Sequence, residues 1–153
     1  MGLNKMAIFF EAIRTGDSKT ILKFLEEGIN PNVQYHGMTA LYYSILNDQA
    51  KIVRLLLDFG ADPNLKEDYF GRTSIFFANL EITALLLAAG ADPNARDYDS
   101  YTPLAGVNKK VAKLLLLAGA DPNVKNNNGG TLLDSASEND NIRMIHLLLR
   151  YGA

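Results

Sequence analysis

The most constraining feature of the sequence is a pentapeptide, Gly-Ala-Asp-Pro-Asn, that recurs at a nearly fixed interval. Complete copies occupy residues 60–64, 90–94 and 119–123, a looser copy occupies 28–32, and a shortened one lies at 152–153. Successive copies begin 29 to 33 residues apart. A period of this length indicates stacked supersecondary units, each of which buries its apolar face against its neighbours. We therefore expect about five such units in a row.

Each copy predicts the end of one helix and the start of a loop. An apolar run such as residues 53–57 precedes the glycine, and a glycine just beyond a helix can take the left-handed conformation that ends it. The proline then stops the helix, while Asp and Asn bond nearby backbone groups in a turn. Another helix is predicted to begin at each of Thr39, Thr73, Thr102 and Thr131. Thr102-Pro103 in particular has the pattern of an N-cap followed by proline at the first helical position.

A helix pair and a projecting loop in about 33 residues, with Gly-Ala-Asp-Pro-Asn and Thr102-Pro103-Leu104, resemble the ankyrin repeat. The resemblance implies an all-α repeat fold, an α-solenoid, in which antiparallel helix pairs stack side by side and β-hairpins project from the stack. We expect a single domain over residues 1–153. Repeats one to five are predicted at residues 6–38, 39–72, 73–101, 102–130 and 131–153.

Two of the repeats are shorter than the others by four residues. From the inner-helix start to the closing glycine there are 21 residues in repeats one, two and five, but 17 in repeats three and four. Either a surface turn is shortened, or the inner helices of repeats three and four end about one turn early and leave a notch that admits a partner loop or a small ligand. Asn79 and Asn108 are expected to form the left-handed turn before the outer helix. Asp48, Asp140 and Gly16 occupy that turn in the full-length repeats.

None of the repeats keeps the histidine that follows Thr-Pro-Leu in the family's pattern. The equivalent residues are Tyr42, Phe76, Ala105 and Asp134. We therefore expect fewer hydrogen bonds between neighbouring repeats, with aromatic packing by Tyr42 and Phe76 in their place. A less stable stack is the predicted consequence, because fewer polar groups would be tied between neighbours.

Composition and charge argue against several other classes of function. The chain has 17 acidic and 15 basic residues, without the positive excess that nucleic-acid binding requires. The apolar stretches are far shorter than the about 20 residues of a membrane helix, and residues 1–6 resemble neither a secretory nor a myristoylation signal. We expect a soluble, cytoplasmic protein with no nucleic-acid or membrane partner. With no cysteine, two histidines and no catalytic motif, we expect no enzymatic activity, no metal and no cofactor.

Candidate binding residues lie in the loops before each threonine. The resemblance implies that partners bind to the hairpin tips and to the inner-helix face. Tyrosine and arginine dominate interface hot spots, and four of the seven tyrosines lie in these loops. The alternative for each ring is that it folds back onto the inner helices as core. The predicted partner-binding residues are Tyr35, His36, Met38, Tyr69, Phe70, Arg72, Tyr98, Asp99, Tyr101, Asn127 and Asn128.

Together these features predict a non-catalytic module that binds a protein partner through a weakly acidic, tyrosine-bearing surface of hairpin tips and inner helices. The alternatives are a regulator or inhibitor, or a host-interaction effector, that masks a surface of its partner. A small-ligand site at the notch of repeats three and four is a further alternative. The last outer helix keeps an apolar run, residues 142–149, which predicts either more repeats beyond it or self-association there.

Overall fold

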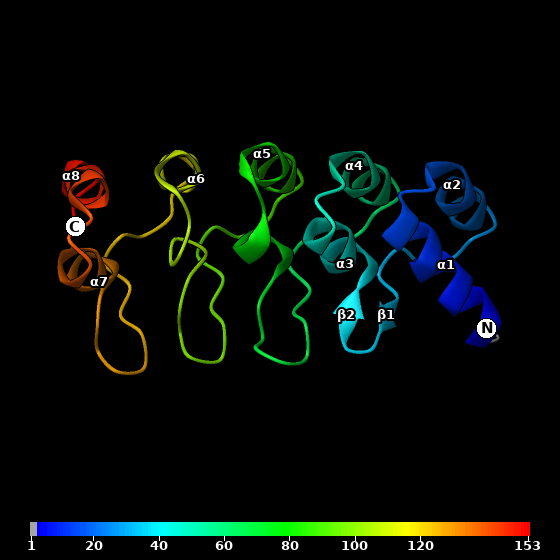
Figure 1. Cartoon of the computed structure of the whole chain (residues 1–153), viewed down its shortest axis with the longest axis horizontal. Helices are drawn as coiled ribbons and strands as arrows, with labels where there is room; N and C mark the ends of the chain where they lie inside the picture. The colour runs from blue at the N-terminus through cyan, green and yellow to red at the C-terminus, as the bar shows by residue number, and fades with distance from the viewer. Residues whose placement is uncertain (1–2) are drawn as a thin grey trace.

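The computed structural model describes residues 3–153 as a row of stacked units with two layers of helices (Figure 1). The predicted repeat stack is confirmed. The outer layer consists of α2 (Ser18–Glu26), α4 (Ala50–Asp58), α5 (Leu80–Ala88), α6 (Lys109–Leu117) and α8 (Ile142–Arg150). The inner layer consists of α1 (Leu3–Thr15), α3 (Ala40–Leu46), the short 3₁₀ helix η1 (Ser74–Phe77) and α7 (Leu132–Glu138). Four loops project from the inner layer, on the side away from the outer helices.

The outer layer is regular because the same leucine is buried in successive repeats. Leu56, Leu86, Leu115 and Leu148 each lie four residues before the closing glycine, and each is 0% exposed. The closing glycines have φ between +85° and +92°, which confirms their predicted left-handed role; they are Gly28, Gly60, Gly90, Gly119 and Gly152. A continuous apolar core therefore runs through all the repeats.

The inner layer differs from the prediction that a helix begins at every threonine. Thr39 caps α3 by accepting a hydrogen bond from the Tyr42 N–H, and Thr131 forms a capping box with Asp134 at the start of α7. In repeat three, however, Thr73 precedes only the single turn η1. In repeat four, Thr102 is followed by a non-helical turn at residues 103–106. The prediction of an inner α-helix is therefore wrong for repeats three and four.

Most of the missing residues come from the inner helix itself. The inner helix of repeat two, α3, has seven residues, so the loss of four leaves too few for an α-helical turn with its own hydrogen bonds. The shortening therefore combines the two interpretations: the left-handed turn before the outer helix is missing, and the inner helix is reduced as well, by more than an early end in repeat four. Repeat four has lost its inner helix altogether, and repeat three keeps a 3₁₀ turn.

Asn79 and Asn108 also differ from their prediction. Both have an extended backbone, with φ of −69° and −71°, and both are N-caps whose side chains accept backbone N–H bonds at the start of α5 and α6. The left-handed turn is confirmed for Gly16, Asp48 and Asp140, which have φ between +51° and +72°. The shortened repeats omit this turn, so their asparagines lie at the following position and cap the helix directly.

The loops between repeats are linked by a ladder of asparagines. The amide of Asn64 donates to the Gly90 carbonyl at 3.0 Å and accepts from the Asp92 N–H at 2.8 Å. Asn32 and Asn94 bond the next repeat in the same two ways, and Asn123 donates to the Gly152 carbonyl. The expected shortage of hydrogen bonds between repeats is therefore wrong, because the Asn of each pentapeptide supplies them.

Aromatic packing between repeats is present, but with a different partner from the one predicted. The ring of Tyr42 in α3 meets the ring of Phe77 edge to face at 5.2 Å, whereas Phe76 was the expected residue. Burial is the main cause that raises the pKa of Tyr42 to about 12, and the nearby Glu67 carboxylate adds to it. In the described part of the chain, every helix is too short or too polar to cross a membrane.

Candidate partner-binding surface

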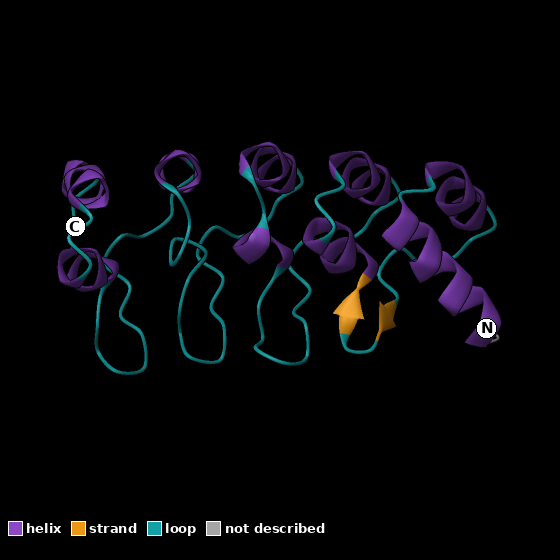
Figure 2. Cartoon of the chain, in the orientation of Figure 1, coloured by secondary structure: helices purple, strands orange, loops and turns teal. Residues whose placement is uncertain are grey.

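The four projecting loops are called the first to fourth hairpins, and they end at Thr39, Thr73, Thr102 and Thr131. Figure 2 shows strands in the first hairpin and loops in the others. In the first, β1 (Gln34–Tyr35) pairs antiparallel with β2 (Met38–Thr39). The tight turn between them uses His36 and Gly37, both with positive φ. This combination matches the right-handed twist of the strands, so the first hairpin is held largely by its own backbone.

The second hairpin is held by a buried carboxylate. Glu67 is 2% exposed, and its side chain accepts hydrogen bonds from the backbone N–H groups of Tyr69 and Phe70 at 2.7 Å and of Arg72 at 3.1 Å. A buried carboxylate is costly unless such donors surround it, and here they are the N–H groups of the tip itself. Glu67 therefore fixes the backbone on which the tip side chains are mounted.

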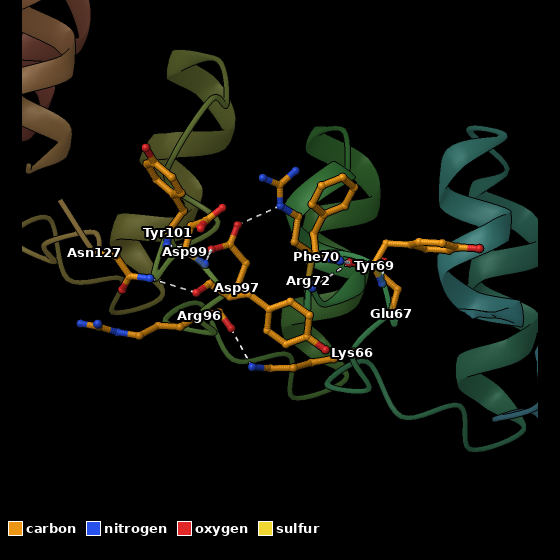
Figure 3. A network of polar contacts seen from close by, with 11 residues as sticks. Lys66, Glu67, Tyr69, Phe70, Arg72, Arg96, Asp97, Asp99, Tyr101 and Asn127 are labelled. Atoms are coloured by element: carbon orange, nitrogen blue, oxygen red, sulfur yellow. Dashed lines mark hydrogen bonds and ion pairs between the residues drawn. The ribbon is translucent and has the colours of Figure 1, made fainter. Parts of the chain in front are cut away.

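Asp97 holds the third hairpin in the same way. It is 5% exposed and accepts from the N–H groups of Asp99 and Tyr101 at 3.0 and 2.9 Å. Its other oxygen accepts from Arg72 Nε at 2.9 Å, which joins the third hairpin to the second (Figure 3). In the fourth hairpin, the Asn126 side chain takes this role and accepts from Asn128 and Gly130 N–H.

These anchoring residues were not predicted from the sequence, although a signal for them is present. Glu67, Asp97 and Asn126 each lie seven residues after the closing glycine of the preceding outer helix. Because Glu67 and Asp97 are buried, they add no charge to the exposed surface of the hairpins. At the exposed tips, Asp68 and Asp99 therefore lie beside the basic residues Lys66 and Arg96.

Neighbouring hairpins are bonded to one another through their backbones. The Asp68 N–H donates to the Gly37 carbonyl at 3.0 Å, and the Tyr98 N–H donates to the Phe70 carbonyl at 2.9 Å. Asn127 N–H donates to the Asp99 carbonyl at 3.0 Å. Lys66 Nζ also reaches the Arg96 carbonyl at 2.7 Å. The tips thus form a continuous strip whose geometry is set across repeats.

The structure places all the predicted binding residues on this strip but exposes them to different degrees. Tyr69, Phe70 and Tyr98 are 57% to 61% exposed, and Tyr101 is 39% exposed. Tyr35 is half-buried, because its ring packs on Phe10 at 5.1 Å and on His36. The other half-buried residues are Met38 and Arg72, whereas His36, Asp99, Asn127 and Asn128 are exposed.

The exposed rings rest on the hairpin before them. Tyr69 Oη donates to the His36 carbonyl at 3.2 Å. The Tyr98 ring lies directly over Gly71, so closely that a Cβ at position 71 would be 2.4 to 2.8 Å from the ring atoms. Gly71 also has φ of +68°, so both space and backbone require glycine there. One side of each ring is therefore fixed while the other faces outward.

Arg72 lies in an aromatic environment. Its guanidinium lies 5.2, 5.8 and 5.6 Å from the ring centroids of Phe70, Phe76 and Phe77. Figure 3 shows the Nε bond to Asp97 and the two terminal nitrogens turned away from that carboxylate. The rings and Asp97 together hold the guanidinium plane in one orientation.

The shortening of repeat four leaves a hollow on each side of its inner turn. The Arg72 hollow, of about 300 Å³, is lined by Arg72, Phe76, Tyr101, Ala105 and Gly106. The Glu138 hollow, of about 560 Å³, lies between the third and fourth hairpins and α7; its lining includes Tyr101, Asn128, Leu132, Asp134, Ser135 and Glu138. The larger space therefore lies between repeats four and five, one repeat beyond the predicted notch.

The acidic side of the Glu138 hollow is built on α7. Asp134 completes the capping box of the helix by accepting from the Thr131 N–H at 2.8 Å and the Thr131 hydroxyl at 2.7 Å. These hydrogen bonds are the main causes that lower the pKa of Asp134, so its carboxylate stays charged at neutral pH. Within residues 3–153, the structure contains no group of three or more His, Cys, Asp or Glu side chains that would hold a metal ion.

Comparison with known proteins gives two regions of similarity to a family model. Residues 9–97 match a model described as ankyrin repeats in three copies, and residues 108–149 match one described as ankyrin repeats in many copies. Among curated proteins, human mitochondrial disaggregase is 37% identical over 67 residues, which covers 43% of this chain and 10% of that protein.

Two further relatives carry ankyrin repeats in their names. An ankyrin repeat protein of fowlpox virus (strain NVSL) is 40% identical over 67 residues, covering 42% of this chain and 9% of the relative. The Mus musculus protein named Ankyrin repeat, SAM and basic leucine zipper domain-containing protein 1 is 31% identical over 111 residues, covering 65% of this chain and 23% of the relative. The chain thus spans less than a quarter of the length of these relatives.

Proposed function

The chain belongs to the ankyrin-repeat family, and from this premise we propose that it is a non-catalytic module that binds a protein partner through its hairpin tips and inner-layer surface. Ankyrin repeats generally serve in protein–protein interaction. A fold alone does not define a binding site, however, so the proposal needs an observation from the surface itself.

The observation that carries the proposal is the set of exposed rings on a fixed backbone. Tyr69, Phe70 and Tyr98 expose more than half of their surface, yet the backbone beneath them is bonded to Glu67 and to the neighbouring hairpins. Large rings with few rotatable bonds contribute much contact area for little loss of entropy. A partner that covers them would bury this area without first ordering the loops.

The anchoring carboxylates support a binding role in preference to catalysis. Glu67 and Asp97 are buried, and their oxygens accept hydrogen bonds from backbone N–H groups and from Arg72. Carboxylates that accept hydrogen bonds from the protein in this way stabilise the hairpin conformation and do not exchange protons with a substrate. The regulator and effector alternatives would use this same strip, and they differ only in the partner bound.

The test is affinity capture from the native host with matched variants. Tyr69→Ser, Phe70→Ser and Tyr98→Ser are combined in one variant. Phe59→Ser, Leu80→Ser and Leu117→Ser form the control, since these three exposed apolar residues lie on outer helices or, for Phe59, at the C-cap of one. We expect the first variant to lose the retained protein and the control to keep it, with both helical CD spectra unchanged. The identity of the retained protein decides between scaffold, regulator and effector. Equal retention by both variants would contradict the proposal.

A second candidate function is favoured by the size of the Glu138 hollow. At about 560 Å³, this hollow falls within the range of small-molecule sites. A thermal-shift screen of metabolites tests for a small ligand. The function is supported if a compound stabilises the wild-type chain but not Leu132→Trp, which fills the hollow. Leu46→Trp, on the exposed side of α3, should keep the stabilisation. The absence of any stabilising compound would count against it.

We also propose self-association through the outer face of α8. Ile142 and Leu149 are 57% and 53% exposed on this helix. They lie seven residues apart, about two turns along the same face of α8, and exposed apolar side chains on one face favour association. Sedimentation over a range of concentrations tests this, and Ile142→Ser with Leu149→Ser should shift the chain to the monomer mass. A wild-type mass that stays monomeric at every concentration would contradict it.

A further inference from the structure

The two hollows beside the inner turn of repeat four form one surface. Tyr101, Ala105 and Gly106 line both the Arg72 hollow and the Glu138 hollow. Of these shared residues, Ala105 and Gly106 have almost no side chain, so little side-chain volume separates the hollows beside the Tyr101 ring. A partner backbone can therefore cross these residues closely and place one side chain in each hollow.

The Arg72 hollow carries a positive charge in a prepared orientation. Arg72 Nε is bonded to Asp97 at 2.9 Å, and three aromatic rings pack around the guanidinium. Among the described residues, the two terminal nitrogens of Arg72 donate no hydrogen bond to an acceptor. An oriented guanidinium with free donors suits a carboxylate, which accepts two parallel hydrogen bonds from such a fork.

The Glu138 hollow carries the opposite charge. Asp134 and Glu138 are four residues apart on α7, so their side chains lie on the same face of the helix. The described residues that line this hollow include neither lysine nor arginine. Lys125 interacts with Asp134 through space, but it is not among the lining residues. The Tyr101 ring completes a site suited to a cationic side chain, which rings attract through their π face.

We propose that this surface binds one extended segment of a protein partner, with a carboxylate side chain against Arg72 and a lysine or arginine against Glu138 and Asp134. The inference rests on the proposed function and deepens it by assigning the partner's charge pattern. Opposite charges at the two ends of the surface also set the direction of the bound segment. A segment with the reversed order would bring like charges together, which disfavours binding.

The probe is a displayed library of random peptides selected on the full chain. We expect the recovered peptides to share one acidic and one basic residue in a fixed order and spacing. Glu138→Lys should weaken binding of the synthesised consensus peptide by about tenfold or more, because it places like charges together. Glu26→Lys, the same change at an exposed position on α2, should leave binding unchanged. Replacing the peptide's basic residue by Glu should restore binding to the Glu138→Lys variant.

The positive end is tested without removing the partner of buried Asp97. Arg72→Lys keeps a positive charge beside Asp97 but removes the guanidinium fork. Replacement of the peptide's acidic residue by Gln should therefore weaken binding to the wild-type chain several-fold, and less so to Arg72→Lys. Equal losses on both chains would show that the peptide's acid does not contact Arg72, and would overturn that half of the assignment.

The remaining outcomes separate this inference from the proposed function. Peptides that depend on Tyr69 and Tyr98, but bind the Glu138→Lys variant as well as the wild type, would overturn the inference and leave the proposed function standing. Dependence on Ile142 and Leu149 would assign the peptides to the α8 face and also overturn it. Recovery of no peptide that binds the chain above a blank surface would count against both.

Discussion

The first and third hairpins both project from the stack, but different interactions fix their tips. The first forms paired strands around a two-residue turn at His36 and Gly37 and leads into the full inner helix α3. The third lacks such strands, is fixed by the buried side chain of Asp97, and leads into a turn without a helix. A hairpin therefore keeps its place in the stack whether strand pairing or a buried side chain holds its tip. A repeat can lose its inner helix and still present its hairpin, provided that the outer helix and an anchoring side chain remain.

The largest expected change in stability concerns the packing of the shortened repeats compared with that of a full repeat. Leu86→Ala and Leu115→Ala should each lower the free energy of unfolding by about 2 to 5 kcal/mol, because each removes a side chain that is 0% exposed. Leu56→Ala in repeat two provides the reference. Denaturant unfolding measures all three. Much smaller losses in repeats three and four would show that the missing inner helices have loosened the outer layer as well.

The next prediction concerns the anchor of the third hairpin. Asp97→Ala should lower the free energy of unfolding by about 1 to 3 kcal/mol, since it leaves two partly buried N–H groups and the Arg72 side chain without their acceptor. Hydrogen exchange should quicken at the Asp99 and Tyr101 amides and stay unchanged in the first hairpin.

Asp97→Asn is the matched control, because an amide oxygen already holds the fourth hairpin at Asn126. This variant should keep the tip amides protected while weakening the link to Arg72. Rapid exchange in Asp97→Asn as well would mean that the charge, and not the acceptor geometry, holds the tip.

A third prediction addresses the ladder that ties full and shortened repeats together. Asn64→Ala should lower the free energy of unfolding by about 1 kcal/mol, because two hydrogen bonds to the next repeat are lost. Asn30→Ala is a suitable comparison, since Asn30 bonds within its own turn. Denaturant unfolding of both variants measures the difference. If both substitutions lower the free energy of unfolding equally, the hydrogen bonds between repeats contribute no more stability than the bond within the turn.

Local sequence signals predicted those parts of the fold that depend on local chemistry. A glycine beyond an apolar run determined the end of each outer helix, and Thr39 and Thr131 determined the start of α3 and α7. The loss of the inner helix in repeat four was not predictable in this way. The spacing from Thr102 to Gly119 shows that residues are missing, but not from which segment. The answer depends on which segment the stack can lose, and that is decided by tertiary packing.

In the candidate site, too, the sequence predicted some features and missed others. The sequence placed aromatic residues on the tips, and Tyr69 and Tyr98 are indeed exposed there. It could not assign Glu67 and Asp97, because a carboxylate in a loop is usually solvated and only the folded tip gathers N–H groups around it. The Asn ladder was missed for a related reason: the two partners of Asn64 lie in the next repeat.

The smallest effect distinguishes two threonines that are equivalent in sequence. Thr39 accepts a hydrogen bond from the Tyr42 N–H, whereas Thr73 makes no side-chain cap bond and its buried Oγ1 has no partner among the described residues. Thr39→Val should therefore lower the free energy of unfolding by about 1 kcal/mol, while Thr73→Val should leave it unchanged or raise it by up to about 1 kcal/mol. Thermal and denaturant unfolding of the two variants give the sign directly. A loss at Thr73 equal to that at Thr39 would show that η1 is capped in solution as α3 is, and that the shortened repeat resembles the full one more closely than its backbone indicates.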